Sequence, residues 1–187
     1  MESTTRPPFA RPIGTDPYLS ALHDHVLIYD GATGTNFQLQ DLHADDFGGA
    51  VLEGCNEMLV LTRPDAVEAL HRSFLDVGVD VIETNSFGAF SVVLNEYGIG
   101  DRAHELSYES ARIARRMADS YASSSEPKFV AGAMGPGTKF PSLGQITYDD
   151  LSASYEEMAY GLLEGGVDLL IVETVYDLLS GKAAIAA

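Results

Sequence analysis

Four polar residues stand at or just beyond the ends of apolar runs of the sequence, and three of them are carboxylates. Asp30, Glu83 and Glu173 each follow such a run, and Asn85 comes shortly after Glu83. If the runs are parallel strands, these side chains meet at one rim, because such strands all end on the same side. Carboxylates held close together are costly unless they share protons or bind a cation, and an ammonium group is a natural cation for them.

The turn that follows Asp30 offers a second kind of binding group. Gly31 and Gly34 lie in this turn, whose backbone N–H groups suit a carboxylate. Acidic side chains beside free amides indicate a pocket for an amino-acid zwitterion. Alternatively, the same acids cap helices or pair with Arg and Lys on the rim, and the residues alone leave both interpretations open.

Four strand–helix units are expected to position these groups. Continuous apolar runs predict buried strands at 26–29, 79–82, 129–134 and 169–172. Helical periodicity or capping predicts helices at 18–25, 64–77, 103–121, 147–162 and 178–187. Residues 36–62 are interpreted as a long polar connection. Strands this apolar, each followed by a helix, belong in a parallel sheet covered by helices.

The fold class is therefore α/β, and two arrangements compete. An open dinucleotide-binding sheet requires Gly-x-Gly-x-x-Gly after its first strand, whereas residues 30–35 read Asp-Gly-Ala-Thr-Gly-Thr. Polar residues at every strand end favour a (β/α)8 TIM-barrel type with its site at the carboxyl rim. We expect only the first four units, a half-barrel: residues 1–15 form a disordered lead-in, and 16–187 form the N-terminal half of the barrel.

Composition excludes several classes of function. The chain carries 11 Lys and Arg against 28 Asp and Glu, a net charge of -17. Such acidity repels phosphate backbones and anionic membranes, so neither nucleic acid nor membrane is an expected partner. Cys55 is the sole cysteine, which excludes an internal disulfide. A cytoplasmic enzyme or binding module is the expectation that remains.

An ordered set of motifs resembles the homocysteine S-methyltransferase family, in particular its methionine synthase branch. The segments that carry the resemblance are 30–35, 54–57 with 61–64, 78–87, 131–138 and 166–177, and together they run from about Val26 to Ala187. The family usually has Gly at the position of Ala32. Each motif is weak alone, but the ordered set is specific.

The resemblance implies substrate-binding roles for particular residues. Asp30 and Glu173 would help to hold the amino group of homocysteine, and the backbone amides of Gly31, Ala32 and Thr33 would approach its carboxylate. Glu83 and Asn85 lie on the same rim and are weaker candidates for contact with the substrate. No catalytic residue and no metal ligand is expected in this half of the barrel.

The reaction that the resemblance implies is methyl transfer from methylcobalamin to the zinc-bound thiolate of homocysteine, which gives methionine. Methyltetrahydrofolate would be the methyl source. The family binds zinc through cysteines in the second half of its barrel, and Cys55 matches none of them. We therefore expect this chain alone to bind no cofactor and to be inactive.

Two alternatives and two kinds of protein partner stay open. The chain could be half of a free-standing methyltransferase that uses S-methylmethionine or betaine, or a non-catalytic half-barrel for binding or assembly. The remaining modules of a full-length enzyme are expected partners, and exposed sheet edges predict a homodimer.

The histidines His43, His71 and His104 are interpreted as surface or boundary residues.

Overall fold

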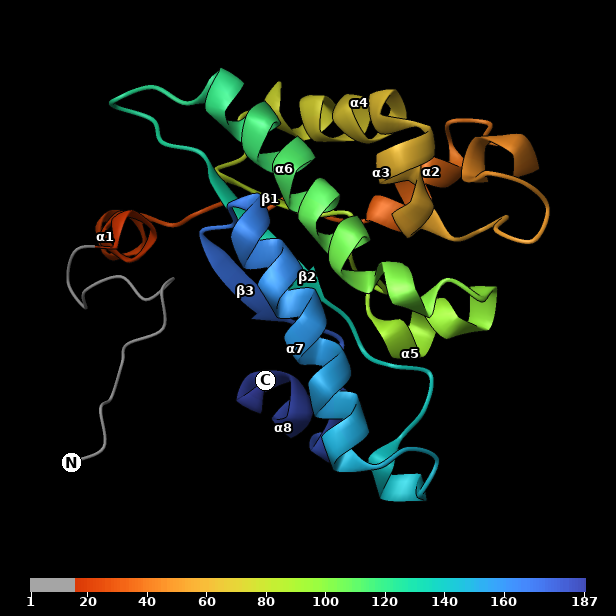
Figure 1. Ribbon diagram of the computed structural model, residues 1–187. Helices are drawn as coiled ribbons and strands as arrows, with labels where there is room; N and C mark the ends of the chain where they lie inside the picture. Colours follow the sequence, from red (N-terminus) through yellow and green to blue (C-terminus); the bar gives the residue numbers. More distant parts are fainter. Residues whose placement is uncertain (1–15) are drawn as a thin grey trace, which may run out of the picture.

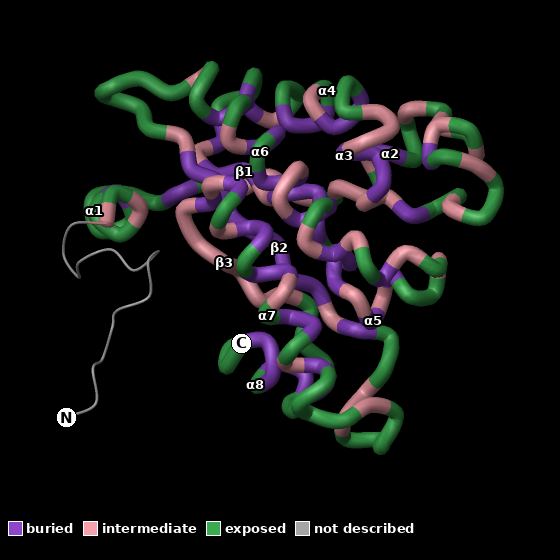
Figure 2. Tube along the Cα trace, in the orientation of Figure 1, coloured by how far each residue is buried: buried purple, intermediate pink, exposed green. Residues whose placement is uncertain are grey.

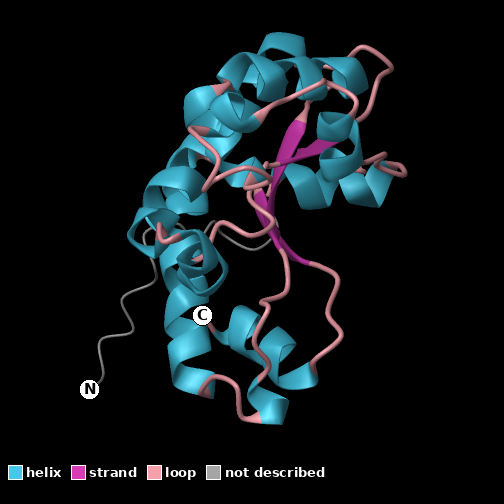
Figure 3. Ribbon diagram, turned by 90° about the vertical axis from the view of Figure 1, so that its right-hand side faces the viewer, coloured by secondary structure: helices cyan, strands magenta, loops and turns pink. Residues whose placement is uncertain are grey.

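A parallel sheet of three strands forms the centre of the computed structural model, which describes residues 16–187 (Figures 1 and 3). The strands are β1 (Val81–Glu83), β2 (Phe129–Met134) and β3 (Leu169–Val172), in that spatial order. Glu83 pairs with Ala131, and Met134 pairs with Val172. The predicted α/β class and parallel sheet are confirmed, whereas the predicted disorder of residues 1–15 lies outside the described residues.

The predicted first strand is wrong as a buried strand. Residues 26–29 contribute a single bridge, from Tyr29 to Val81, beside β1. Val26 is 78% exposed and Ile28 55% exposed, and only Leu27 of this run is buried. The Ile28 N–H donates to the Asp80 carboxylate at 2.9 Å, so a side chain takes the place of a strand partner.

The helices are grouped around this sheet, and most lie where periodicity predicted them. The α-helices are α1 (Pro17–Asp24), α2 (Thr33–Gln38), α3 (Leu59–Thr62), α4 (Pro64–Leu75), α5 (Ser91–Leu94), α6 (Ala103–Tyr121), α7 (Tyr148–Gly165) and α8 (Leu178–Ala186). The 3₁₀ helices are η1 (Ala44–Phe47), η2 (Asn56–Met58), η3 (Asn95–Tyr97), η4 (Gly100–Arg102) and η5 (Pro141–Leu143). The predicted long connection at 36–62 is thus folded into short helices that pack near the ends of the strands.

Helices α6 and α7 cover one face of the sheet and pack tightly on each other (Figure 1). A Cβ at Gly161 would lie 2.7 Å from the carbonyl oxygen of His104, and one at Gly165 would lie 2.6 Å from that of Tyr108. Only glycine permits this approach of α7 to α6. Helix α7 begins where the Thr147 hydroxyl accepts the Asp150 N–H at 3.1 Å, as the predicted cap requires.

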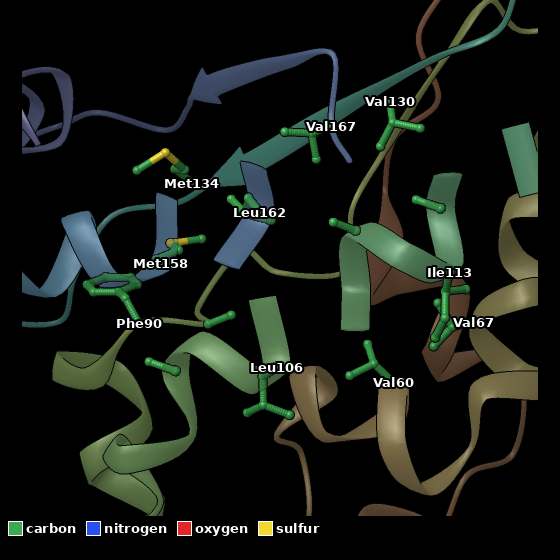
Figure 4. Close-up of a cluster of buried hydrophobic side chains, with 14 of the residues drawn as sticks. Val60, Val67, Phe90, Leu106, Ile113, Val130, Met134, Met158, Leu162 and Val167 are labelled. Carbon is green, nitrogen blue, oxygen red and sulfur yellow. The ribbon is translucent and has the colours of Figure 1, made fainter. Parts of the chain in front are cut away.

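The two faces of the sheet carry different cores. The face toward the helices holds Val130 and Met134, which pack with Ile113 and Leu162 in the large cluster of Figure 4. On the opposite face a smaller cluster includes Val81, Phe129 and Ala131. Helix α1 covers part of that face, where the Tyr18 ring meets the Phe129 ring edge-on at 5.5 Å. Strand β3 is only half-buried along its length (Figure 2).

His71 of α4 corrects the interpretation of the histidines as surface or boundary residues, because it is buried. Its side chain is 1% exposed, and neither ring nitrogen has a hydrogen-bond partner among the described residues. Burial lowers the pKa of His71 to about 4, so the ring is neutral at physiological pH.

Between residues 16 and 187, no helix is both long and apolar enough to cross a bilayer.

Candidate functional site

A cavity of about 380 Å³ opens at the carboxyl ends of the three strands. Each strand contributes to its wall at or near its last residue: Glu83 from β1, Ala133 from β2 and Glu173 after β3. The start of α2 and the segment at η2 close two further sides. The complete lining is Ala32, Thr33, Gly34, Thr35, Asn56, Glu57, Glu83, Thr84, Asn85, Ser86, Phe87, Ala133 and Glu173.

The structure brings five of the seven predicted site residues to this cavity. They are Ala32, Thr33, Glu83, Asn85 and Glu173. Asp30 and Gly31 are not part of the lining. The Asp30 carboxylate instead accepts the Glu83 N–H at 2.9 Å, and this bond joins the chain before α2 to the end of β1.

The three carboxyl groups predicted to meet affect one another electrostatically: the charge of Glu83 acts on Asp30, and the charge of Glu173 acts on Glu83. Burial, together with the charge of Glu83, raises the pKa of Asp30 to about 7, although hydrogen bonds from backbone N–H groups oppose the rise. Burial and the charge of Glu173 raise the pKa of Glu83 to about 7. Burial also raises the pKa of Glu173. Ionisation of the whole group is therefore unfavourable unless a cation enters, which is the property expected of an ammonium site.

Hydroxyl groups that sequence reasoning missed hold this rim together. The Ser86 hydroxyl donates to the Ala133 carbonyl oxygen at 2.8 Å, and the Ala133 N–H donates to the Thr84 hydroxyl at 3.0 Å. The two hydroxyl oxygens lie 2.6 Å apart. Because the Ser86 proton points to Ala133, Thr84 donates to Ser86. This closed ring extends the contact of β1 with β2 beyond the last backbone pair, Glu83 with Ala131.

The segment at η2 was also missed as a contributor to the site. Asn56 and Glu57 both line the cavity, and the Asn85 amide donates to the Asn56 carbonyl oxygen at 2.7 Å. The only signal in the sequence was the family-like segment 54–57, to which no role could be assigned from the residues themselves. Phe87, partly exposed, adds an aromatic surface to the same wall.

Two residues beside the cavity adopt a strained backbone. Ala32, which precedes α2, and Thr174, which follows Glu173, both have φ 54°, in the left-handed region that favours glycine. Such strain occurs where the surroundings hold a segment in place, often at functional sites. At Ala32 it sets the start of α2 and hence the direction of the N–H groups of its first turn.

The residues present do not suit zinc. Residues 16–187 contain no group of three or more His, Cys, Asp and Glu side chains placed to hold a metal ion. Cys55 is buried, and burial together with the charge of Glu57 raises the pKa of its thiol to about 12. A thiol that stays protonated is a poor ligand, because zinc binds the thiolate.

The parallel sheet, the helices over it and a polar cavity at the strand ends define an α/β protein of the TIM-barrel type. Similar folds occur in crystal structures of the homocysteine methyltransferase MmuM from Escherichia coli. For the metallated form the TM-score is 0.72 at 19% identity, with 88% of this chain and 59% of that chain covered. For the apo form the TM-score is 0.65 at 21% identity, with 88% and 56% covered.

The chain belongs to the homocysteine S-methyltransferase family, whose model matches residues 27–187. It is 47% identical over 167 residues to the methionine synthase of Mycobacterium tuberculosis, covering 89% of this chain and 14% of that protein. It is 46% identical to the methionine synthase of Mycobacterium leprae over the same lengths. The chain thus spans about one seventh of these relatives, at 14% of their length.

Proposed function

We propose that this chain supplies the homocysteine-binding rim of a cytoplasmic methyltransferase of the methionine synthase type. In that enzyme it would form the first four strand–helix units of a (β/α)8 barrel. The observation that carries the proposal is the cavity at the strand ends, where Glu83 and Glu173 face the first turn of α2. Identities of 46–47% to methionine synthases favour this branch over a free-standing enzyme using S-methylmethionine or betaine.

The carboxyl groups of the rim would hold the ammonium end of homocysteine. Glu173 and Glu83 line the cavity, and Asp30 stands behind Glu83 through the bond to its N–H. An ammonium group among them would offset their mutual repulsion and lower their raised pKa values. An ammonium ligand would thus supply the positive charge that the lining, which holds half-buried Glu83 and Glu173 but no Lys or Arg, does not itself provide.

The opposite end of the substrate would face the turn before α2. The first turn of a helix leaves backbone N–H groups without partners in the helix, and these suit a carboxylate. Ala32 and Thr33, which line the cavity, and Gly31, which precedes them outside the lining, are the residues proposed to supply such N–H groups. Asn85 on the neighbouring wall is a further polar contact. With both charged ends held, the side chain of homocysteine would extend toward the open mouth of the cavity.

The proposed enzyme transfers a methyl group to the homocysteine sulfur. A free thiol has a pKa of about 8.5 and is mostly protonated near neutral pH, whereas zinc stabilises the attacking thiolate. Because the described residues do not suit zinc, that metal would be held by other parts of the complete enzyme. Methylcobalamin, recharged by methyltetrahydrofolate, would supply the methyl group there. The residues of this chain bind and orient the substrate, and the chain alone is expected to be inactive.

Calorimetry with L-homocysteine tests the binding proposal. We expect the wild-type chain to bind, and Glu173→Gln to weaken binding by about 1.5–3 kcal/mol, the range for hydrogen bonds to charged groups. Glu156→Gln, which removes an exposed carboxylate on α7, is the matched control and should bind normally. Unchanged affinity in Glu173→Gln would remove Glu173 from the proposed site.

Assembly through the sheet edges is a second proposal. β3 has a strand neighbour on one side only, and residues 26–28 leave Val26 and Ile28 exposed beside β1. Unpaired edges recruit other chains, and a two-fold axis would set β3 of one copy beside residues 26–28 of the other. Light scattering at micromolar concentration should then give the mass of a dimer, and a stable monomer would refute the pairing.

A further inference from the structure

One wall of the cavity is built by a segment that belongs to no strand. Residues 54–58, here called the η2 wall, place Asn56 and Glu57 in the cavity lining. On one side this wall touches α2: a Cβ at Gly34 would lie 3.7 Å from the Asn56 amide nitrogen. Its position therefore influences how the start of α2 and the strand ends sit relative to each other.

Two hydrogen bonds join the η2 wall to the loop that follows β1. The Asn85 amide donates to the Asn56 carbonyl oxygen at 2.7 Å, and the Gly88 N–H donates to Glu57 Oε1 at 2.8 Å. Both donors belong to buried residues. The bonds connect segments about 30 residues apart in sequence, at positions 56–57 and 85–88, so they fix tertiary rather than local structure.

The carboxylate of Glu57 has its partners inside the protein. Besides the Gly88 N–H, the buried Cys55 thiol lies 3.7 Å from Glu57 Oε2. A Cβ at Gly88 would lie 2.9 Å from Glu57 Oε1 and 3.1 Å from Val93 Cγ1, so glycine is needed for the carboxylate to approach. These contacts distinguish Glu57 from Glu83 and Glu173, because within residues 16–187 no backbone N–H of a neighbouring segment donates to either of their carboxylates.

We propose that Glu57 is a positioning residue, which holds the loop Asn85–Gly88 against the η2 wall and so keeps Asn85 directed along the homocysteine cavity. This inference rests on the proposed function and deepens it. Glu57 acts by accepting the Gly88 N–H, and not by binding the substrate ammonium. A neutral acceptor of the same shape should therefore replace it, whereas a direct contact with the ammonium would require the charge.

Three variants separate these roles in the 187-residue chain. Glu57→Ala removes the acceptor, and we expect its affinity for L-homocysteine to fall about tenfold, equivalent to roughly 1.4 kcal/mol. Glu57→Gln retains an oxygen for the Gly88 N–H and should bind within about threefold of wild type, below 1 kcal/mol. Glu53→Ala removes an exposed carboxylate shortly before the η2 wall and serves as the control with unchanged affinity.

Amide hydrogen exchange at Gly88, followed by NMR, tests the hydrogen bond without any ligand. Exchange should be faster in Glu57→Ala than in wild type and nearly unchanged in Glu57→Gln. If Glu57→Ala does not fold, Gly88→Ala displaces the carboxylate from the other side and should weaken binding similarly, since its Cβ would meet Glu57 Oε1. Faster exchange together with weaker binding supports the proposal.

Three results would overturn it. Equal weakening in Glu57→Gln and Glu57→Ala would mean that the charge acts on the ligand. Wild-type affinity in Glu57→Ala would mean that the loop needs no such contact, and unchanged Gly88 exchange would mean that the bond does not protect it. If the wild-type chain binds no homocysteine, the proposed function fails, and the exchange result alone decides whether Glu57 holds the loop.

Discussion

Asp30→Asn is the sharpest test of the electrostatics at the rim. In the wild-type chain the Glu83 N–H donates to Asp30 Oδ1 at 2.9 Å. The substitution removes the charge but leaves a side-chain oxygen that can still accept this N–H. Its effect on stability therefore reports the cost of ionising this carboxyl group. Burial comes first among the causes that raise the pKa of Asp30 from 3.8 to about 7, and the charge of Glu83 adds to it.

The magnitude and its sign follow from proton linkage. One pKa unit corresponds to about 1.4 kcal/mol, so a rise from 3.8 to about 7 sets a ceiling near 4 kcal/mol. Because Asp30 and Glu83 titrate together, we expect about half of this, roughly 2 kcal/mol, from Asp30 alone. A raised carboxyl pKa favours the folded state below the unfolded pKa, and this advantage is lost as pH rises from about 4 through about 7.

Urea unfolding followed by circular dichroism at pH 4.5, about 6 and about 8 measures the effect. Near pH 4.5 the two proteins should have similar free energies of unfolding, and near pH 8 Asp30→Asn should be more stable by about 2 kcal/mol. Asp45→Asn, which alters an exposed carboxylate of η1, should show no such difference. If the difference between Asp30→Asn and wild type were the same at every pH, or if Asp30→Asn became the less stable protein as pH rose, ionisation of Asp30 would not cost stability and the reasoning would be wrong.

Three further substitutions test particular features by urea unfolding. His71→Leu should raise the free energy of unfolding by about 1–3 kcal/mol, because it removes an unpaired buried ring. Wild type should lose stability as pH falls from 6.5 through about 4, because the buried His71 ring resists protonation, and His71→Leu should abolish this loss. A destabilised variant would instead reveal a partner for the ring. Tyr155→Phe should lower the free energy of unfolding by about 1–1.5 kcal/mol, because the Tyr155 hydroxyl donates to the buried Gly135 carbonyl oxygen at 2.9 Å. An unchanged free energy of unfolding would mean that this bond contributes nothing to stability. Ala32→Gly should stabilise by about 0.5–1 kcal/mol, because glycine relieves the left-handed strain. Ala69→Gly, at an exposed position of α4, should instead destabilise by about 1 kcal/mol, and the same sign in both variants would refute the strain.

Periodicity predicted the helices and inner strands because their burial follows from local patterns. Helices α6 and α7 repeat apolar residues at the helical period, and β2 is apolar and buried throughout. The run 26–29 is just as apolar, yet it forms only one bridge. Its fate depends on what lies on its outer side, where Val26 and Ile28 are exposed, and a short apolar run carries no information about that neighbour.

His71 shows the same limit for a side chain. A single histidine on a helix has no pattern of its own, and its burial is set by the packing of α4 against α6. The predicted site residues were easier, because the end of a parallel strand places a side chain on a known rim whatever the details of packing. Glu83, Asn85 and Glu173 reach the cavity for this reason, whereas Asn56 and Glu57 arrive by a tertiary contact.

Within residues 83–87, the hydroxyl side chains at positions 84 and 86 alternate with Glu83, Asn85 and Phe87. This alternation lets the rim carry an acidic side chain while hydroxyl groups fix its backbone. Thr84 and Ser86 use their hydroxyls to join β1 to Ala133 of β2 after the backbone pairing has ended. Buried backbone groups need partners, so without these hydroxyls the Ala133 N–H and carbonyl would require a longer β1. Because side-chain hydroxyls make these contacts, the Glu83 carboxyl takes no part in joining β1 to β2.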